Sequence, residues 1–375
     1  EVLRRFTERL RHCAAPREII SRLGADEFAM ILPDLADGAL AGVAGQLVLD
    51  ALVAPISLAV GEVKIGASIG ISLFPVDAET PEVLLQHADL ALHDAKSRGN
   101  GQMSFYQSTM NEAVSERVAL VTELHHALER GELELHYQPQ VNLADQKVIG
   151  VEALMRWRHP QRGVIPPARF IPLAEESGLI VPMGAWALEE ACRQNRAWQL
   201  AGLPPMVMAV NLSAVQFRER KLQETVARAL ANSQLDPGWL ELEVTESVIM
   251  DGAERMLDQL ADLRSLGVQL SIDDFGTGYS SLAYLTRFEV NKLKIDQAFV
   301  RGALKHERDA TIVGTIIQMA KGLHLRVIAE GVETSEQAAM LLQHGCDEGQ
   351  GYLFARPLPP AELERFLLQK QNPAA

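Results

Sequence analysis

The sequence predicts an α/β protein in two parts: a TIM-like closed (β/α) barrel, preceded by a smaller, partial α+β segment. From residue 131 onward, short apolar strands alternate with helical patterns, and six or more strand–helix units fit into about 240 residues. Before residue 108 the chain mixes helices and short strands without that repeat. Of the 375 residues, 47% are hydrophobic and 22% charged, which is the composition of ordinary globular domains.

The elements of the first segment follow from hydrophobic periodicity. Helices are predicted over 2–11, 38–52 and 81–96, and the last of these stops at the Gly99-Asn100-Gly101 turn. An apolar run at 28–32 and an alternating pattern at 63–73 predict strands. A continuous helix over 108–130 is expected to join the two parts, with a packed face formed by Val114, Val118, Val121, Leu124 and Leu128.

The barrel elements come from the alternation beyond residue 131. Strands are predicted at 133–137, 148–154, 207–210, 240–244, 268–272, 292–295 and 327–329. Helices are predicted at 186–200, 221–231, 253–266, 309–322 and 335–344. Only the polar link 142–147 joins the first two strands, whereas a parallel crossover needs about a dozen residues. One of these two strands is therefore expected to be antiparallel.

Charge and cysteine usage exclude several classes of protein. With 35 Lys and Arg against 49 Asp and Glu, the net charge is −14, and no basic patch offers a surface for DNA or an anionic membrane. An acidic protein can still bind a phosphodiester when metal ions supply positive charge. Cys13, Cys192 and Cys346 are far apart and form no CxxC pair, so we expect free thiols in a reducing, cytoplasmic compartment.

Membrane insertion is not expected from the hydrophobic pattern. The longest candidate run, 43–60, is interrupted by Gln46, Asp50 and Pro55, so it is too polar for a membrane span. The chain starts at Glu1 and not at Met, so we expect that preceding residues are missing.

Polar side chains lie in, or just after, most of the predicted barrel strands. They are Glu152, Asn211, Glu243, Glu246, Asp273, Asp274, Lys294, Asp296, Glu330, Glu333 and Gln350, the last in a glycine-flanked turn. Catalytic groups of such barrels sit at the carboxyl ends of the strands, so these side chains would converge on one mouth. A single Asp after a strand is usually a helix cap or turn residue, and the argument therefore depends on the whole set.

The composition of this set predicts a metal site. Gathered carboxylates would repel and raise one another's pKa unless cations neutralised them. Hard oxygen donors without Cys or His favour Mg²⁺ or Mn²⁺ over Zn²⁺. The adjacent Asp273 and Asp274 could bridge two ions about 3.5–4 Å apart, as in-line phosphoryl displacement requires. The pattern alone thus suggests a two-metal phosphoesterase.

The motifs at these positions resemble the EAL family of cyclic-di-GMP phosphodiesterases over residues 120–370. The matching motifs are Tyr137-Gln138-Pro139, Glu152-Ala153-Leu154 with Met155-Arg156-Trp157, the stretch 170–180, Asn211-Leu212-Ser213, 243–247, 273–282, Lys294-Ile295-Asp296, 330–333 and Gln350-Gly351-Tyr352. A lone EAL tripeptide carries little information. All these motifs, in order and at family-like spacing, are very specific.

The resemblance implies a role for each position. Glu152, Asn211, Glu243 and Asp273 would hold one divalent ion, and Asp273 would bridge to a second ion shared with Asp274 and Glu330. Lys294 would orient the attacking water, Glu333 would accept its proton, and Glu246 would anchor the loop 274–282. Asp296 joins these catalytic candidates. The substrate-binding candidates are Gln138, Arg156, Leu154 and Gln350, with Arg156 gripping a phosphate.

The implied activity is hydrolysis of cyclic-di-GMP to linear pGpG by water activated between two Mg²⁺ or Mn²⁺ ions, in bacterial second-messenger signalling. The alternative is a non-catalytic cyclic-di-GMP receptor or scaffold. The intact acidic set argues against that alternative, because binding alone does not require both metal sites. The resemblance also makes a homodimer through barrel helices plausible.

The first segment resembles part of a GGDEF diguanylate cyclase domain. The resemblance rests on 22–28, where Ala25 replaces the second glycine, and on 64–75, 88–96 and Ser104-Phe105-Tyr106. We expect no cyclase activity, because Asp26 and Glu27 alone cannot form a two-metal site and a Cβ at Ala25 crowds the turn. Regulatory GTP binding remains an alternative. The expected organisation is a non-catalytic segment at 1–107, a helical linker at 108–119 and the barrel at 120–370, with the first segment less stable than the barrel.

Overall fold

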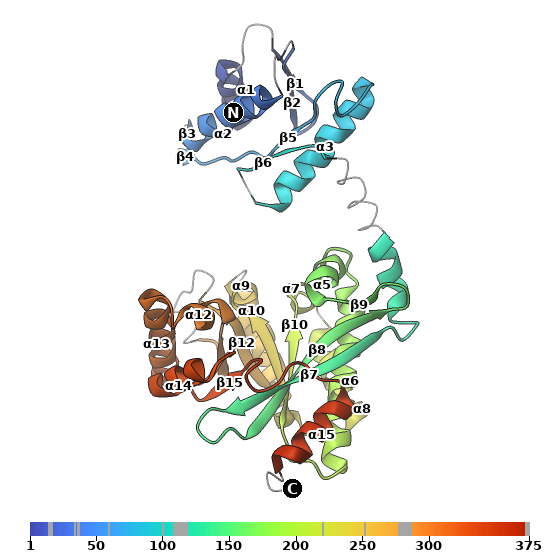
Figure 1. Ribbon diagram of the computed structural model, residues 1–375, viewed down its shortest axis with the longest axis vertical. Coiled ribbons are helices and arrows are strands. Elements are labelled where there is room, and N and C mark those ends of the chain that lie inside the picture. The colour runs from blue at the N-terminus through green and yellow to red at the C-terminus, as the bar shows by residue number, and fades with distance from the viewer. Residues whose placement is uncertain are drawn as a thin grey trace. The chain divides into compact units, whose positions relative to one another are not determined.

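The computed structural model describes residues 1–13, 18–33, 35, 38–58, 61–99, 101–107, 119–219, 221–250, 253–276 and 287–371. The chain divides into two compact units, Glu1–Ala119 and Leu120–Ala375 (Figure 1). Each unit is described by itself.

The second unit is a closed eight-stranded barrel (Figure 1). Its strands are β7 (Leu133–Asn142), β8 (Val148–His159), β10 (Val207–Leu212), β11 (Leu240–Thr245), β12 (Gln269–Phe275), β13 (Lys292–Ile295), β14 (Arg326–Ala329) and β15 (Glu348–Gln350). Neighbours pair in that order, and β15 closes the barrel by pairing with β7. Strand β7 is antiparallel to both neighbours and every other pair is parallel, which confirms the predicted barrel with one antiparallel strand.

One barrel strand was not expected. The turn predicted around Gln350 is wrong, because residues 348–350 form β15, which pairs with β14 on one side and β7 on the other. Its sequence, Glu-Gly-Gln, lacks the apolar residues that identify a strand. A short strand, β9 (Gly163–Ile165), forms a hairpin with the end of β8 outside the barrel.

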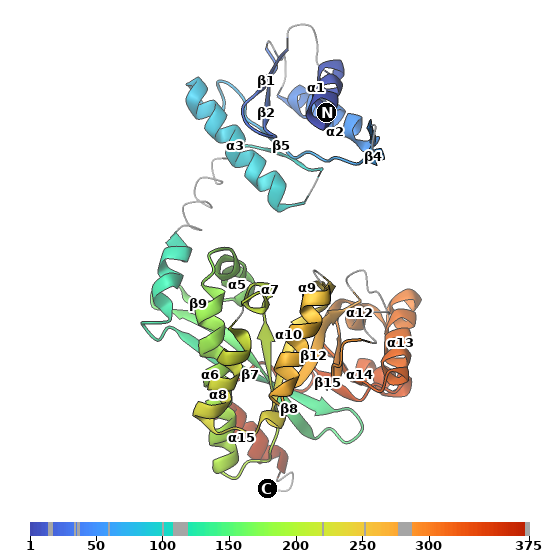
Figure 2. The same ribbon diagram turned by 180° about the vertical axis from the view of Figure 1, so that it is seen from behind.

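Helices surround the barrel on its outer side, as the front and back views show (Figures 1 and 2). They are α5 (Pro167–Glu176), α6 (Ile180–Leu200), α7 (Ala214–Phe217), α8 (Leu222–Ser233), α9 (Glu246–Met250), α10 (Ala253–Ser265), α12 (Gln297–Gly302), α13 (Glu307–Gly322), α14 (Ser335–His344) and α15 (Pro360–Gln371). All five predicted helices are present. Among the described residues, no helix combines the length and the apolar character needed to cross a membrane.

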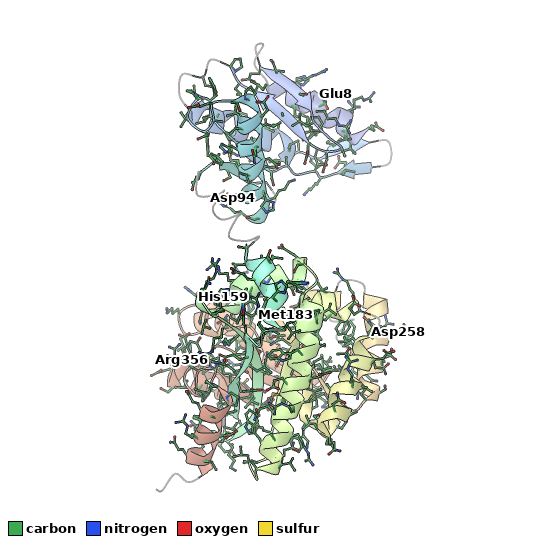
Figure 3. All side chains as sticks on the ribbon, turned by 90° about the vertical axis from the view of Figure 1, so that its right-hand side faces the viewer. Glu8, Asp94, His159, Met183, Asp258 and Arg356 are labelled. Atoms are coloured by element: carbon green, nitrogen blue, oxygen red, sulfur yellow. The ribbon has the colours of Figure 1, made fainter. Side chains whose placement is uncertain are left out.

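The hydrophobic core lies between strands and helices because alternate strand residues point outward. Val151 and Leu242, for example, are fully buried against the helical layer. A second cluster joins Leu120 and Leu124, from the helical turns at 119–127, to the barrel residue Trp157, and Met183 of α6 belongs to it (Figure 3). The predicted joining helix is confirmed over 119–127, but its last three residues, 128–130, form a turn instead, and its part at 108–118 lies outside the described residues.

Tyr137 of β7 offers a test of this core. Its ring is fully buried and packs edge-on against Trp198, with ring centroids 4.8 Å apart, and its hydroxyl has no hydrogen-bond partner among the described residues. We expect Tyr137→Phe to leave the free energy of unfolding unchanged or to raise it by about 1 kcal/mol, because it removes a buried unsatisfied polar group. Urea unfolding of both proteins measures this, and a loss of stability would contradict the unpaired hydroxyl.

The described residues of the first unit form three helices, α1 (Val2–Cys13), α2 (Ala39–Val53) and α3 (Pro81–Ser97). Its strands form three pairs: β1 (Ile19–Arg22) with β2 (Phe28–Ile31), β3 (Ile56–Leu58) with β4 (Gly61–Val63), and β5 (Ile69–Ile71) with β6 (Met103–Phe105). The single strand predicted over 63–73 is wrong, because residues 64–68 join no ladder. The three predicted helices are confirmed.

The first unit also has a small core. Its hydrophobic cluster contains only three buried residues among those described, Leu10, Val48 and Leu52, while Ile19 and Ile31 are more than half exposed. Since stability depends on buried apolar area, we expect limited proteolysis to cleave within residues 1–107 before it cleaves the barrel. Mass spectrometry of the fragments measures this. Early cleavage inside the barrel, with residues 1–107 intact, would contradict the expectation.

Candidate active site

The interior of the barrel is lined by polar side chains at its carboxyl-terminal mouth. The ladders set Gln138 beside Glu152 and Asn211 beside Glu243. Because side chains alternate along a strand, Leu154 and Arg156 follow Glu152 on the same face of β8. Predicted site residues therefore lie at this mouth on seven strands, which are β7, β8, β10, β11, β12, β13 and β15, and Glu330 follows directly after β14.

Lys294 of β13 is the centre of this cluster and is completely buried. Its Nζ lies 2.6 Å from Glu243 Oε2 and 2.6 Å from Glu330 Oε1. Asp273 Oδ1 is 3.2 Å away and Glu152 Oε1 is 3.9 Å away. One ammonium group thus holds four carboxylates, from β8, β11, β12 and the residue after β14, in fixed positions.

Glu152 is held by two amides as well. Asn211 Nδ2 donates a hydrogen bond of 2.6 Å to Glu152 Oε1. Gln350 Nε2 donates to Glu152 Oε2 and, over 3.1 Å, to Gln138 Oε1. Both carboxylate oxygens of Glu152 are therefore oriented before any ligand arrives.

A bulge brings Asp274 to the same mouth as Asp273. On a regular strand, adjacent side chains point to opposite faces. Here the pairing of β12 with β13 shifts register between Ile272 and Phe275, and Asp274 adopts a left-handed φ of 53°. The backbone N–H of Asp274 donates a 2.9 Å hydrogen bond to Asp273 Oδ1, and the carboxylates of Asp273, Asp274 and Glu330 offer oxygens within 4.8 Å of one another.

The cluster contains more carboxyl groups than cationic groups, and the pKa values of its members are shifted. Burial raises the pKa of Glu330 to about 8 and that of Asp274 to about 6, and the neighbouring Asp273 adds to both shifts. Burial also raises the pKa of Glu243 well above its usual value. Burial would lower the pKa of Lys294, but the surrounding carboxylates, Asp273 foremost, raise it well above its usual value. The lysine stays charged and cannot neutralise five carboxyl groups by itself.

The residues present fit divalent cations. Glu243 Oε1 is buried and has no hydrogen-bond partner among the described residues, so it is an acceptor that a cation would satisfy. The candidate ligands at the mouth are carboxylate oxygens and the amide of Asn211, whose nitrogen donates to Glu152 Oε1. Such a set suits Mg²⁺ or Mn²⁺.

The substrate-facing candidates lie around the mouth. Arg156 is half-buried on β8 and donates to the carbonyl oxygen of Met155, and Gln138 Nε2 donates 3.1 Å to the carbonyl oxygen of Ala355. After β15, the Arg356 guanidinium stacks 4.2 Å above the Tyr352 ring, and both side chains are exposed (Arg356 is labelled in Figure 3). Arg356 was not among the residues predicted from the sequence. An arginine four positions after the aromatic residue Tyr352 could have indicated this cation–π contact.

The remaining candidates take different positions. Glu246, 1% exposed, accepts a 2.8 Å hydrogen bond from the backbone N–H of Gly276, where the loop after β12 begins. The rest of that loop, 277–286, lies outside the described residues. Asp296 caps α12 through Ala298 N–H and hydrogen-bonds to Asp274. Glu333 is exposed and forms a 3.0 Å ion pair with Arg301, and its role as proton acceptor stays a prediction.

Comparison with known proteins identifies the family. Residues 121–357 match the model of the EAL domain, and residues 1–102 match that of the diguanylate cyclase, GGDEF domain. The chain therefore belongs to the EAL domain family, which confirms the resemblance seen in its motifs.

Named relatives support the same assignment. The bifunctional diguanylate cyclase/cyclic di-GMP phosphodiesterase MucR of Pseudomonas aeruginosa is 44% identical over 356 residues, which cover 95% of this chain and 52% of MucR. The cyclic di-GMP phosphodiesterase NbdA of Pseudomonas aeruginosa is 42% identical over 367 residues, covering 98% of this chain and 47% of NbdA. The chain thus spans about half the length of these relatives.

A solved structure of the PaMucR phosphodiesterase in complex with c-di-GMP shares the barrel fold. It is 48% identical, with a TM-score of 0.64, and the match covers 65% of this chain and 99% of that one.

Proposed function

We propose that this chain is a metal-dependent phosphodiesterase that hydrolyses cyclic-di-GMP to linear pGpG. The observation that carries the proposal is the convergence of four carboxylates on one buried lysine, Lys294, with a fifth carboxylate, Asp274, beside two of them at the barrel mouth. The names of MucR and NbdA, and the c-di-GMP in the PaMucR structure, supply the substrate class. That residues 1–107 are non-catalytic stays a prediction. A homodimer through the barrel helices also stays a prediction.

The proposed metal ligands are those that the family resemblance implies, and the proximity of Asp273, Asp274 and Glu330 supports the second site. Glu152, Asn211, Glu243 and Asp273 would hold one cation, and Asp273, Asp274 and Glu330 would hold the second. When bound, the two cations would supply Lewis-acid activation of the phosphodiester and of the attacking water. Among the described residues, the one group that could hold a metal ion consists of carboxylates, without Cys or His.

The protein's own groups would orient the reaction. Lys294 fixes the carboxylates at set spacings, because its Nζ touches three of them within 3.2 Å. Arg156, above Glu152 on β8, is a planar donor suited to a phosphate oxygen. Gln138 and Leu154 would border the bound nucleotide, and Gln350 would do so from β15. Glu333 would accept the proton of the attacking water.

The proposal is tested by turnover of cyclic-di-GMP in EDTA, Mg²⁺ or Mn²⁺, with chromatography of the products. We expect pGpG only with a divalent cation, and no product from Glu152→Ala. Glu129→Ala serves as the matched control, since that side chain is 80% exposed. Binding of cyclic-di-GMP without turnover in any metal would contradict the proposal and favour the receptor alternative.

The hydrogen bond from the Gly276 N–H to Glu246 leads to a second prediction, which concerns the turnover rate. We expect Glu246→Ala to lower kcat about 10- to 100-fold, because a hydrogen bond to a buried charged group contributes about 1.5–3 kcal/mol and this one sets the start of the loop after Asp274. Glu246→Gln, which keeps an acceptor, should lose less. Steady-state kinetics measure both variants, and equal losses would show that the charge, and not the loop contact, matters.

A further inference from the structure

A second polar layer lies inside the barrel beneath the mouth. Its members stand two residues deeper than mouth residues on the same strands: Gln140 below Gln138, Glu241 below Glu243, Lys292 below Lys294, and Glu348 below Gln350. All four side chains are at most 3% exposed. Barrels of this type usually fill their interior with branched apolar residues, so a buried polar layer requires a physical reason.

The charges of the deeper layer balance one another. Lys292 Nζ lies 3.0 Å from Glu241 Oε2 and 2.9 Å from Glu348 Oε2. Arg326 reaches Glu348 Oε1 over 3.3 Å. Two cationic and two anionic side chains leave no net charge, in contrast to the mouth, where carboxylates are in excess. The deeper layer therefore needs no further cation to balance its charge.

One hydrogen-bonded chain connects the two layers. Lys292 Nζ donates to Gln140 Oε1 over 3.5 Å, and Gln140 Nε2 donates to Gln350 Oε1 over 3.1 Å. Gln350 Nε2 then donates to Glu152 Oε2. An ammonium group can only donate and a carboxylate can only accept, so the two ends fix the direction of both amides between them.

Gly150 makes this chain sterically feasible. It stands beside Gln140 in the β7–β8 ladder. A Cβ at this position would lie 3.0 Å from Gln140 Oε1 and 3.0 Å from the carbonyl oxygen of Val207. The missing side chain leaves the space that the Gln140 amide occupies.

The geometry points to Gln140 and Lys292 as positioning residues for the metal ligand Glu152. Lys292 orients Gln140, Gln140 orients Gln350, and Gln350 holds Glu152 Oε2 while Asn211 holds Oε1. The inference rests on the proposed function, in which Glu152 binds a cation. Without the donor of Gln140, Gln350 Oε1 loses its partner, and the amide is held only through its nitrogen, by Glu152 Oε2 and Gln138 Oε1.

The test is calorimetric titration of the metal-free chain with Mn²⁺. Gln140→Leu removes the relay and keeps the size of the side chain. Gln140→Glu keeps an acceptor for Lys292 but cannot donate to Gln350. We expect both variants to bind Mn²⁺ about 10-fold more weakly or worse, the usual loss when an outer-shell partner is removed. Gln194→Leu is the control, since Gln194 is also buried, at 9% exposed, but lies on α6, outside the barrel interior.

The outcomes separate this inference from the proposed function. Absence of Mn²⁺ binding by the unmodified chain would overturn the proposed function. Tight binding by the unmodified chain and by both Gln140 variants would overturn only the positioning role. Thermal melting in EDTA is recorded for each variant. If both Gln140 variants were unfolded, the positioning role would also be overturned, because the hydrogen-bonded chain would then stabilise the fold and not orient the metal ligand Glu152. If Gln194→Leu weakened Mn²⁺ binding as much as the Gln140 variants, the positioning role would likewise be overturned.

Discussion

Asp273→Asn is expected to abolish the hydrolysis of cyclic-di-GMP while the barrel stays folded. Asp273 is the carboxylate that both cations would share, and it lies 3.2 Å from Lys294 Nζ. A metal site contributes several kcal/mol to the transition state, and each factor of ten in rate corresponds to about 1.4 kcal/mol. We therefore expect kcat to fall about a thousandfold or more, measured by product chromatography in saturating Mn²⁺.

The matched control is Asp258→Asn on α10, an exposed position labelled in Figure 3. It should keep full activity. Asparagine has the shape of aspartate, so Asp273→Asn should keep its melting temperature in EDTA within a few degrees. Substantial turnover by Asp273→Asn would contradict a shared metal ligand at this position.

Lys294→Met is expected to destabilise the barrel and to remove its activity. The substitution keeps the length of the side chain and deletes the one ammonium group among the carboxylates. Removing one partner from a buried ion pair costs about 3–5 kcal/mol, because the remaining charges are left uncompensated. Urea unfolding in EDTA measures this loss, and Mn²⁺ should restore part of it by neutralising the same carboxylates.

Lys305→Met is the matched control, since Lys305 is exposed in the turn between α12 and α13. It should unfold at the same urea concentration as the unmodified chain. If Lys294→Met proved as stable as that control, Lys294 could not be the residue that holds the cluster together.

The fold was predictable where apolar runs marked the strands. Strand β13 was predicted at its observed bounds, and the short link 142–147 correctly indicated an antiparallel partner for β8. Strand β15 was not predictable in the same way, because Glu348, Gly349 and Gln350 carry no apolar signal. It is stable as a strand because it closes the barrel between β14 and β7.

The site, like the fold, contains features that the sequence predicts and features that it does not. The residues that gather at the mouth were found because polar side chains follow apolar strands. The route by which Asp274 joins Asp273 could not be predicted, since it depends on a bulge and on a left-handed φ of 53°. The deeper layer could not be predicted from the polar residues that follow the strands, because its members lie inside them. The repeated two-residue spacing, as in Glu241 and Glu243 or Lys292 and Lys294, was a signal for it.

The central claim is that the acidic mouth holds two divalent cations through the shared carboxylate of Asp273. Anomalous diffraction from crystals of the chain grown with Mn²⁺ tests this most directly. The account predicts two peaks about 3.5–4 Å apart, one next to Glu152, Asn211 and Glu243 and the other next to Asp274 and Glu330, with Asp273 between them. A mouth without manganese peaks, or with a single ion away from Asp273, would contradict it.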